Sequence, residues 1–291
     1  MGSLEHYLPV QNELGETPIW VPKEKALYWV DIGSHTIYRV DPATASYERF
    51  KPDMPVRGLC RRTEGGWLLI TDAGLAFWDR QSNVCEFIVD PFSENPDIQF
   101  NDGMIDRQGR LVVGSFNSVR LDAPDGSLFR LDADRGLHRL DKNLVLSNGI
   151  AVSPDSRTLY VSEMFANKIT AYDYEAETGT VSNRRVFVAI PKEAGMPDGL
   201  TVDSQGFIWA AHWGGWRATR YDPAGKLERE IRVPVELVTC IGFGGENLDE
   251  LYITTAWYNL SDRQRKAQPL AGDLFRIKTD IKGIVEPGFA G

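Results

Sequence analysis

The feature that most constrains the fold of this chain is a unit of two short apolar strands that recurs along its whole length. Each unit begins with a strand of aromatic and β-branched residues, continues through a polar gap and ends with a second strand. The first strands of the six units begin at residues 27, 67, 111, 159, 208 and 251, so the repeat length lies between 40 and 49 residues. A repeat of this length, built from several short strands, is typical of β-propeller blades.

The pattern between these strands argues against any helical fold class. No stretch of about a dozen residues shows the periodicity of an amphipathic helix, and turns rich in Asp, Gly, Pro and Asn separate the strands instead. We therefore predict an all-β fold, a six-bladed β-propeller in which residues 1–291 form a single domain. The N-terminal segment at residues 6–10 is predicted to pair with strands from the C-terminus, which would close the ring and remove an open sheet edge.

Charge and composition indicate a cytoplasmic protein that binds neither nucleic acid nor membrane. The formal net charge is -9, and this excess of acidic residues argues against nucleic-acid binding, which requires a basic patch. No apolar run approaches the roughly 20 residues needed to cross a bilayer, and no signal peptide is indicated at the N-terminus. The three cysteines, Cys60, Cys85 and Cys240, are too few for a disulfide framework, and we interpret them as reduced and buried.

One position near the start of each repeat is polar, about ten residues before the first strand of the unit. The residues at this position are Glu16, Arg57, Asn101 (with Asp102 beside it), Asn148, Asp198 and Cys240. In a propeller the innermost strand of each blade lines the central channel, and the residue that opens this strand lies near one mouth. The repeat therefore predicts a ring of oxygen donors around the channel axis.

Two carboxylates in this ring, Glu16 and Asp198, predict a metal site. Facing carboxylates in a channel of low dielectric constant repel each other unless a cation neutralises them. A divalent cation bound by both, with the amide oxygen of Asn148 as a neutral ligand, would do so. Ligation by oxygen alone favours Ca²⁺ or another hard ion, because zinc sites more often contain His or Cys. A single Asn-Gly or Asp-Gly pair would indicate only a turn, but recurrence at one register favours a functional site.

Several motifs carry a resemblance to a known family, and they occur in that family's order. They are Gly15-Glu16-Thr17-Pro18, Asn101-Asp102-Gly103, Ser147-Asn148-Gly149, Pro197-Asp198-Gly199 and Phe243-Gly244-Gly245. From about residue 13 to residue 278, the chain resembles the gluconolactonase and regucalcin (senescence marker protein) family of six-bladed propellers. The resemblance implies hydrolysis of a sugar lactone to the aldonic acid, supported by Ca²⁺, Zn²⁺, Mg²⁺ or Mn²⁺.

The resemblance also implies roles for individual residues. One divalent metal would be bound by Glu16, Asn148 and Asp198, and Asn101 would contact water or substrate beside it. The metal would polarise the lactone carbonyl while Asp198 acts as general acid and base. Family members often have an arginine two residues before the Asn of Asn-Asp-Gly, where it contacts the sugar. Here that residue is Gln99, which can still bind hydroxyl groups but carries no charge, so the particular lactone stays open.

Other interpretations stay open from the sequence alone. A phosphotriester hydrolase on the same kind of propeller would be favoured by a histidine in the ring, and no ring position is histidine. A metal-binding or ligand-binding propeller without turnover is the third possibility, and the retained acid Asp198 argues against it. Arg57 could pair with a carboxylate or bind a substrate oxygen, and His212 could be structural or contact substrate. The metal, the oligomeric state and the substrate contacts in residues 117–126 are not determined.

Overall fold

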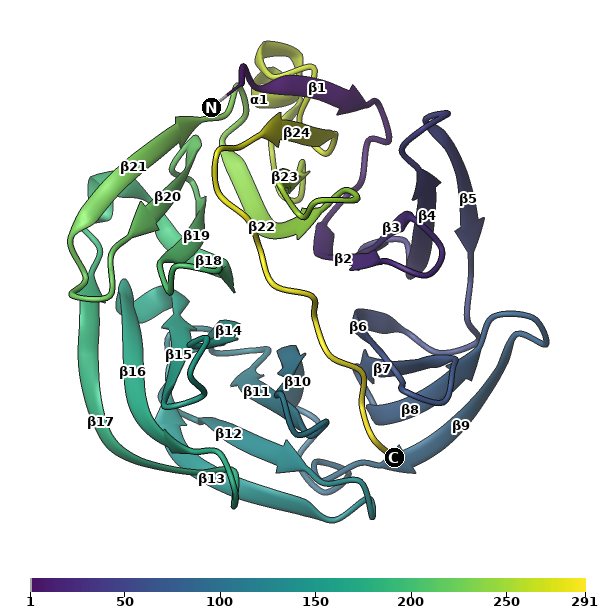
Figure 1. The fold of residues 1–291 in the computed structure, drawn as a ribbon, viewed down its shortest axis with the longest axis vertical. Helices are drawn as coiled ribbons and strands as arrows, with labels where there is room; N and C mark the ends of the chain where they lie inside the picture. The colour runs from purple at the N-terminus through teal and green to yellow at the C-terminus, as the bar shows by residue number, and fades with distance from the viewer. Residues whose placement is uncertain (1) are drawn as a thin grey trace.

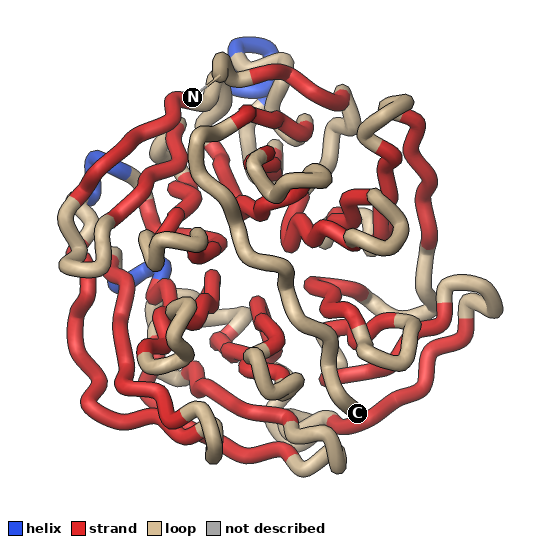
Figure 2. The backbone as a smooth tube through the Cα atoms, viewed as in Figure 1, coloured by secondary structure: helices blue, strands red, loops and turns tan. Residues whose placement is uncertain are grey.

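The computed structural model describes residues 2–291 and shows antiparallel sheets arranged as a ring about a central axis (Figure 1). The predicted all-β, propeller-like fold is confirmed: strands form nearly all of the regular structure, and helical segments are few and short (Figure 2). The strands form four four-stranded sheets and one eight-stranded sheet.

The four-stranded sheets each contain strands that are consecutive in the chain. The first has β2 (Gly15–Val21), β3 (Ala26–Asp31), β4 (Thr36–Asp41) and β5 (Ser46–Phe50). The second has β6 (Val56–Arg61), β7 (Trp67–Thr71), β8 (Gly74–Asp79) and β9 (Val84–Val89). The third has β10 (Ile98–Ile105), β11 (Leu111–Asn117), β12 (Gly126–Leu131) and β13 (Leu137–Leu144). The fourth has β14 (Ser147–Val152), β15 (Thr158–Glu163), β16 (Lys168–Glu175) and β17 (Thr180–Ala189).

The eight-stranded sheet consists of two four-strand segments. One segment has β18 (Met196–Val202), β19 (Ile208–Trp213), β20 (Arg217–Tyr221) and β21 (Leu227–Arg232). The other has β22 (Leu237–Gly244), β23 (Glu250–Ala256), β24 (Leu274–Lys278) and the N-terminal β1 (Glu5–Leu8), which pairs with β24. A single residue pair, Trp213 with Leu237, joins the two segments. The prediction of six separate blades is therefore confirmed only in part, because this pair merges two of the expected units into one sheet.

The helical segments lie in connections between strands. They are the 3₁₀ turns η1 (Met164–Ala166) and η2 (Lys192–Ala194) and the short helix α1 (Asp262–Ala267). The sequence analysis missed α1, although a capping box between Ser261 and Gln264 marks its start. Within residues 2–291, no helix combines the length and the apolar character that crossing a bilayer requires.

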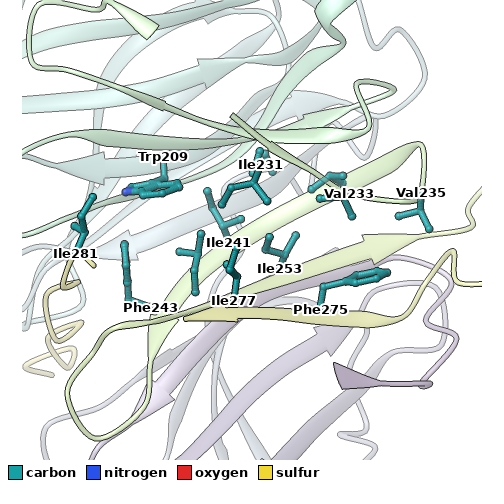
Figure 3. Packing of buried hydrophobic residues seen from close by; sticks show 14 of the residues in the cluster. Trp209, Ile231, Val233, Val235, Ile241, Phe243, Ile253, Phe275, Ile277 and Ile281 are labelled. Carbon is teal, nitrogen blue, oxygen red and sulfur yellow. The ribbon is translucent and has the colours of Figure 1, made fainter. Parts of the chain in front are cut away.

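Apolar side chains from neighbouring four-strand segments pack together to form the core. In the cluster of Figure 3, Trp209 of β19 lies close to side chains that project from the segment β22 to β24. The labelled residues of that segment are Ile241, Phe243, Ile253, Phe275 and Ile277. Because burial of such a side chain contributes about 1.5–3 kcal/mol, these contacts stabilise the ring and hold the inner strands in place.

The innermost strands β2, β6, β10, β14, β18 and β22 surround the axis (Figure 1). Each of them has a break in its pairing register with the next strand of its sheet. The breaks lie between residues 16 and 19, 56 and 58, 100 and 103, 148 and 150, 197 and 200, and 238 and 240. A β-bulge changes the direction in which side chains leave a strand. The bulges therefore coincide with the polar position of each repeat and direct those side chains toward the axis.

The C-terminal strap, residues 279–291, runs across the axis after β24 and ends beside the second sheet (Figure 1). Backbone hydrogen bonds join Phe289 to Arg61 and Thr63, and Ala290 donates to the carbonyl of Gly109 at 2.8 Å. The Phe289 side chain is fully buried in the core between the second and third sheets. The strap is thus an ordered part of the ring.

Candidate active site

One cavity of about 580 Å³ brings together every residue that the sequence analysis assigned to the site. Its wall contains Glu16 of β2, Gln99 and Asn101 of β10, Asn148 of β14 and Asp198 of β18. These residues are separated by up to 182 positions in the chain, from 16 to 198, and belong to four different sheets. The ring of inner strands is therefore what assembles the cavity.

Two of the expected ring residues face a different space. Asp102 and Cys240 line a smaller chamber of about 60 Å³, together with Glu286 of the C-terminal strap. Asn101 and Asp102 both lie in the register break of β10, between residues 100 and 103, and their side chains line different cavities. The prediction of one continuous ring of donors at one mouth is wrong for Cys240 and Asp102.

Glycines bring the inner strands close enough for the polar side chains to meet. A Cβ atom on Gly149 would clash with the backbone nitrogen of Leu200, and one on Gly199 would clash with the Sγ atom of Cys240. Both glycines directly follow a site residue, Asn148 and Asp198 respectively. The Asn-Gly and Asp-Gly pairs are thus close-approach positions between strands, where a side chain has no room.

Asn148 and Asp198 contact each other directly. The Nδ2 atom of Asn148 donates a hydrogen bond to Oδ1 of Asp198, while Oδ1 of Asn148 accepts one from the backbone N–H of Gly149 at 3.0 Å. Both side chains are buried, as is Glu16, whose Oε2 accepts a hydrogen bond from the backbone N–H of Thr17 at 3.2 Å. Three polar side chains from three sheets therefore share one desolvated region.

The carboxyl groups of this region have raised pKa values. Burial, and then the nearby charge of Asp102, raises the pKa of Glu16 to about 8. Burial also raises the pKa of Asp198 well above its usual value, and the charges of Glu16 and Asp102 raise it further. The charge of Glu16 thus disfavours the ionised form of Asp198, as expected for buried acids that share a site.

The donor set fits a hard divalent cation in its chemistry. It contains two buried carboxyl groups and one amide, all of which offer oxygen ligands. Rotation of the Asn148 amide would exchange its nitrogen for its oxygen beside Asp198. Within residues 2–291, no cluster of three or more His, Cys, Asp or Glu side chains is arranged to hold a metal.

Asn101 is fixed by hydrogen bonds on both sides of its amide. Its Nδ2 atom donates to the carbonyl oxygen of Ser147 at 3.1 Å, and its Oδ1 accepts from Nη2 of Arg57 at 3.3 Å. Gln99 lies two residues earlier on the same strand and lines the same cavity. The two amides form one polar side of the cavity.

Comparison with known proteins identifies the family of the chain. Residues 14–257 match the family model described as the SMP-30/Gluconolactonase/LRE-like region. This chain belongs to that family. The gluconolactonase and regucalcin resemblance predicted from the motifs is therefore confirmed.

Individual members of the SMP-30/Gluconolactonase family match over nearly the whole chain. Regucalcin of Xenopus laevis is 32% identical over 287 residues, covering 96% of this chain and 95% of that protein. Pentonolactonase XacC of Haloferax volcanii is 36% identical over 284 residues, covering 95% and 94%. The crystal structure of a calcium-binding protein, regucalcin, from Agrobacterium tumefaciens has a TM-score of 0.93 at 25% identity, covering 99% and 97%.

Half of the residues that line the cavity of this SMP-30/Gluconolactonase family member are apolar, and the sequence analysis missed them. The apolar lining residues are Leu14, Ile32, Phe116, Leu121, Leu146, Met164, Phe165, Trp213, Leu237, Tyr258 and Leu260. Most lie at strand ends or in loops, where no repeat register marks them. Large apolar residues in polar loops, such as Phe165 and Tyr258, were the only signal available, and both are partly exposed.

Two further features of the sequence now have a place in the structure. His212 lies buried outside this cavity, with Nε2 2.7 Å from Thr219 Oγ1 and Nδ1 3.0 Å from the carbonyl oxygen of Ala194. Burial lowers its pKa to about 4, so it is a neutral, structural histidine. In the segment 117–126, Ser118 and Leu121 line the cavity.

Proposed function

We propose that this protein is a divalent-metal-dependent hydrolase that opens a sugar lactone to its aldonic acid. The observation that carries the proposal is the convergence of Glu16, Asn148 and Asp198, from three sheets, in the wall of one cavity that also contains Asn101 and Gln99. The 36% identity to a pentonolactonase over nearly the whole chain supports the substrate class. Ligand pockets of a few hundred Å³ are of the size that encloses a small molecule.

Glu16, Asn148 and Asp198 would hold the cation. Ca²⁺ suits their oxygen atoms best, and the description of the similar Agrobacterium protein as calcium-binding supports it; Zn²⁺, Mg²⁺ or Mn²⁺ are alternatives. When bound, such an ion polarises the lactone carbonyl as a Lewis acid.

Asp198 acts as general base and general acid. Its carboxylate accepts a proton from the attacking water as the water oxygen bonds to the carbonyl carbon. It returns the proton to the ring oxygen as the carbon–oxygen bond of the lactone breaks. Burial and neighbouring acids raise the pKa of this carboxyl group while no cation is bound, and a bound cation would lower it again.

Asn101 and Gln99 bind the substrate through its oxygen atoms. Each side chain offers an amide that can donate to or accept from a hydroxyl group. The hydrogen bond from Asn101 to Ser147 holds its amide in one orientation before substrate arrives. The apolar residues of the wall add nonpolar surface against which the carbon atoms of the substrate ring can pack.

We also propose that the chain is one domain with six blades. The two halves of the eight-stranded sheet each have the same four-strand, antiparallel order as the four separate sheets, and within residues 2–291 a single strand pairing, Trp213 with Leu237, joins them. The pairing of β1 with β24 gives the last segment its fourth strand. Six equivalent segments agree with the six repeats in the sequence.

The test is titration of acid released from a panel of aldono-1,4-lactones and aldono-1,5-lactones, with and without a chelator. We expect release that stops with chelator and returns when Ca²⁺, Zn²⁺, Mg²⁺ or Mn²⁺ is added in excess. An aryl phosphotriester is assayed alongside. Hydrolysis of the phosphotriester in preference to every lactone would contradict the proposal, as would metal binding without turnover of any of these compounds.

A further inference from the structure

We infer that Arg57 determines specificity in this site by donating hydrogen bonds to the hydroxyl oxygens of a hydroxylated lactone. This inference rests on the proposed lactone hydrolysis and adds a residue to it. Arg57 lies in the register break of β6, between residues 56 and 58, and lines the same cavity as Glu16 and Asn101. Arg57 is neither one of the proposed metal ligands nor the group that transfers the proton.

The charge of the cavity wall singles out Arg57. Among residues 2–291, the acidic side chains that line this cavity are Glu16, Asp198 and Glu236, and Arg57 is the one basic side chain that does so. Arginine carries only N–H donors and is always charged, whereas carboxylates only accept hydrogen bonds. A substrate oxygen on this side of the cavity therefore finds its one charged donor at Arg57.

Two hydrogen bonds and one aromatic ring hold the guanidinium group in place. Nη1 donates to Oδ1 of Asp72 at 2.9 Å, and Nη2 donates to Oδ1 of Asn101 at 3.3 Å. The guanidinium carbon lies 5.1 Å from the ring centroid of Phe116, in the range of a cation–π contact. The Arg57 side chain is therefore a preorganised donor whose position does not depend on substrate.

These internal contacts use only part of the hydrogen-bonding capacity of Arg57. A guanidinium group has five N–H donors, and two of them are used by Asp72 and Asn101. Nε is buried and has no hydrogen-bond partner within the described residues. Nη1 and Nη2 carry four of the five N–H donors, so two Nη hydrogens are left for the oxygen atoms of a ligand in the cavity.

Arg57 also complements the neutral side of the cavity. Asn101, which it orients, and Gln99 offer amides from β10, and Arg57 adds a charged donor from the neighbouring inner strand β6. The three groups together match a ring that carries several hydroxyl groups. A lactone without hydroxyl groups would leave these donors unpaired, and it would therefore bind less well.

The test compares two lactones with the same five-membered ring, a pentono-1,4-lactone and unsubstituted γ-butyrolactone. For Arg57→Gln we expect kcat/KM to fall about 10- to 100-fold more for the pentonolactone than for γ-butyrolactone, mostly through KM. Arg57→Lys keeps the positive charge but loses the planar guanidinium group with its paired N–H donors, so its loss of kcat/KM on the pentonolactone should be intermediate. The matched control is Arg185→Gln, which removes an arginine paired with Asp173 on the surface, away from the cavity.

Equal losses on both lactones, or no loss on either, would overturn the role of Arg57. If Arg57→Gln does not fold, Asp72→Asn is used instead, because it removes one hydrogen-bond partner of the guanidinium. It should lower the ratio of kcat/KM for the pentonolactone to kcat/KM for γ-butyrolactone severalfold. An unchanged ratio would contradict the inference. Calorimetry of ligand binding separates this result from failure of the proposed function. If wild-type protein hydrolyses neither lactone, the lactonase proposal is contradicted. The role of Arg57 is then tested by the binding of the ring-opened acids: Arg57→Gln should weaken pentonate binding at least tenfold more than 4-hydroxybutyrate binding.

Discussion

Asn148 donates a hydrogen bond from its Nδ2 atom to the Oδ1 atom of Asp198, which lies fifty residues later in the chain and in a different sheet. The bond is possible because Gly149 lets β14 approach β18 without a clash against Leu200. It ties a neutral amide to a buried acid that has a second acid, Glu16, nearby. This small group of side chains is the centre of the predictions that follow.

Replacement of Asp198 separates metal binding from proton transfer. For Asp198→Asn we expect turnover of the best lactone to fall roughly 10²–10⁴-fold, because an amide cannot accept the proton from water. Asp198→Ala should in addition weaken metal affinity, since it removes the ligand oxygen altogether. Metal affinity is measured by calorimetry and turnover by acid release, with the exposed Asp173→Asn as control. Full turnover by either variant with metal bound would show that Asp198 is not the base.

Replacement of Glu16 tests the repulsion between the two buried acids. Glu16→Gln should raise the Tm of metal-free protein at pH 8, because it removes a negative charge that opposes ionisation of Asp198. Ca²⁺ at a hundredfold excess over its Kd should raise the Tm of wild-type protein by roughly 5 °C, and that of the variant much less. Thermal melts with and without chelator measure both effects, and Glu48→Gln, at an exposed ion pair with Arg39, is the control. An equal Ca²⁺ response in both proteins would exclude Glu16 as a ligand.

Gly149 should not tolerate a side chain. Gly149→Ala forces β14 and β18 apart, and overpacking of this kind costs about 1–3 kcal/mol. We expect a lower free energy of unfolding in denaturant titrations and a loss of lactonase activity in the fraction that still folds. Gly136→Ala is the matched control, since its Cβ would meet only the side chains of Asp134 and His138. If both variants were equally stable, the close approach of the inner strands would not be essential.

The C-terminal strap should make stability depend on pH through Glu286. Burial raises the pKa of Glu286 from 4.5 to about 7, an effect that Arg107 and Arg61 reduce and Asp102 increases. The folded state then binds more protons than the unfolded state between these values, so this residue lowers stability as pH rises from about 4.5 to about 7. Glu286→Gln should flatten that decline and be more stable than wild type at pH 8, as measured by chemical denaturation. The exposed Glu94→Gln should leave the decline unchanged, and an unaltered slope in Glu286→Gln would contradict the prediction.

The repeat was enough to predict the all-β, propeller-like architecture and the convergence of distant residues. A strand is recognised from the local alternation of apolar and polar residues, and a repeat spacing of 40 to 49 residues can be read from the sequence without knowledge of contacts. For the same reason Glu16, Asn148 and Asp198 could be grouped: residues at one register of a repeat occupy equivalent places about an axis. The glycine that follows Asn148 or Asp198 is part of this pattern, because the same close approach recurs from strand to strand.

The tertiary structure alone decided which side of the inner strands each polar residue faces. Asn101 and Asp102 are adjacent in the chain, yet the bulge in β10 directs one to the larger cavity and the other to the chamber beneath the strap. The pairing of Arg57 with Asp72 and the apolar wall from the loops also lacked any periodic signal. Spacing along a chain determines which residues are equivalent in a repeat, whereas side-chain direction at a bulge and contacts between loops depend on packing across sheets.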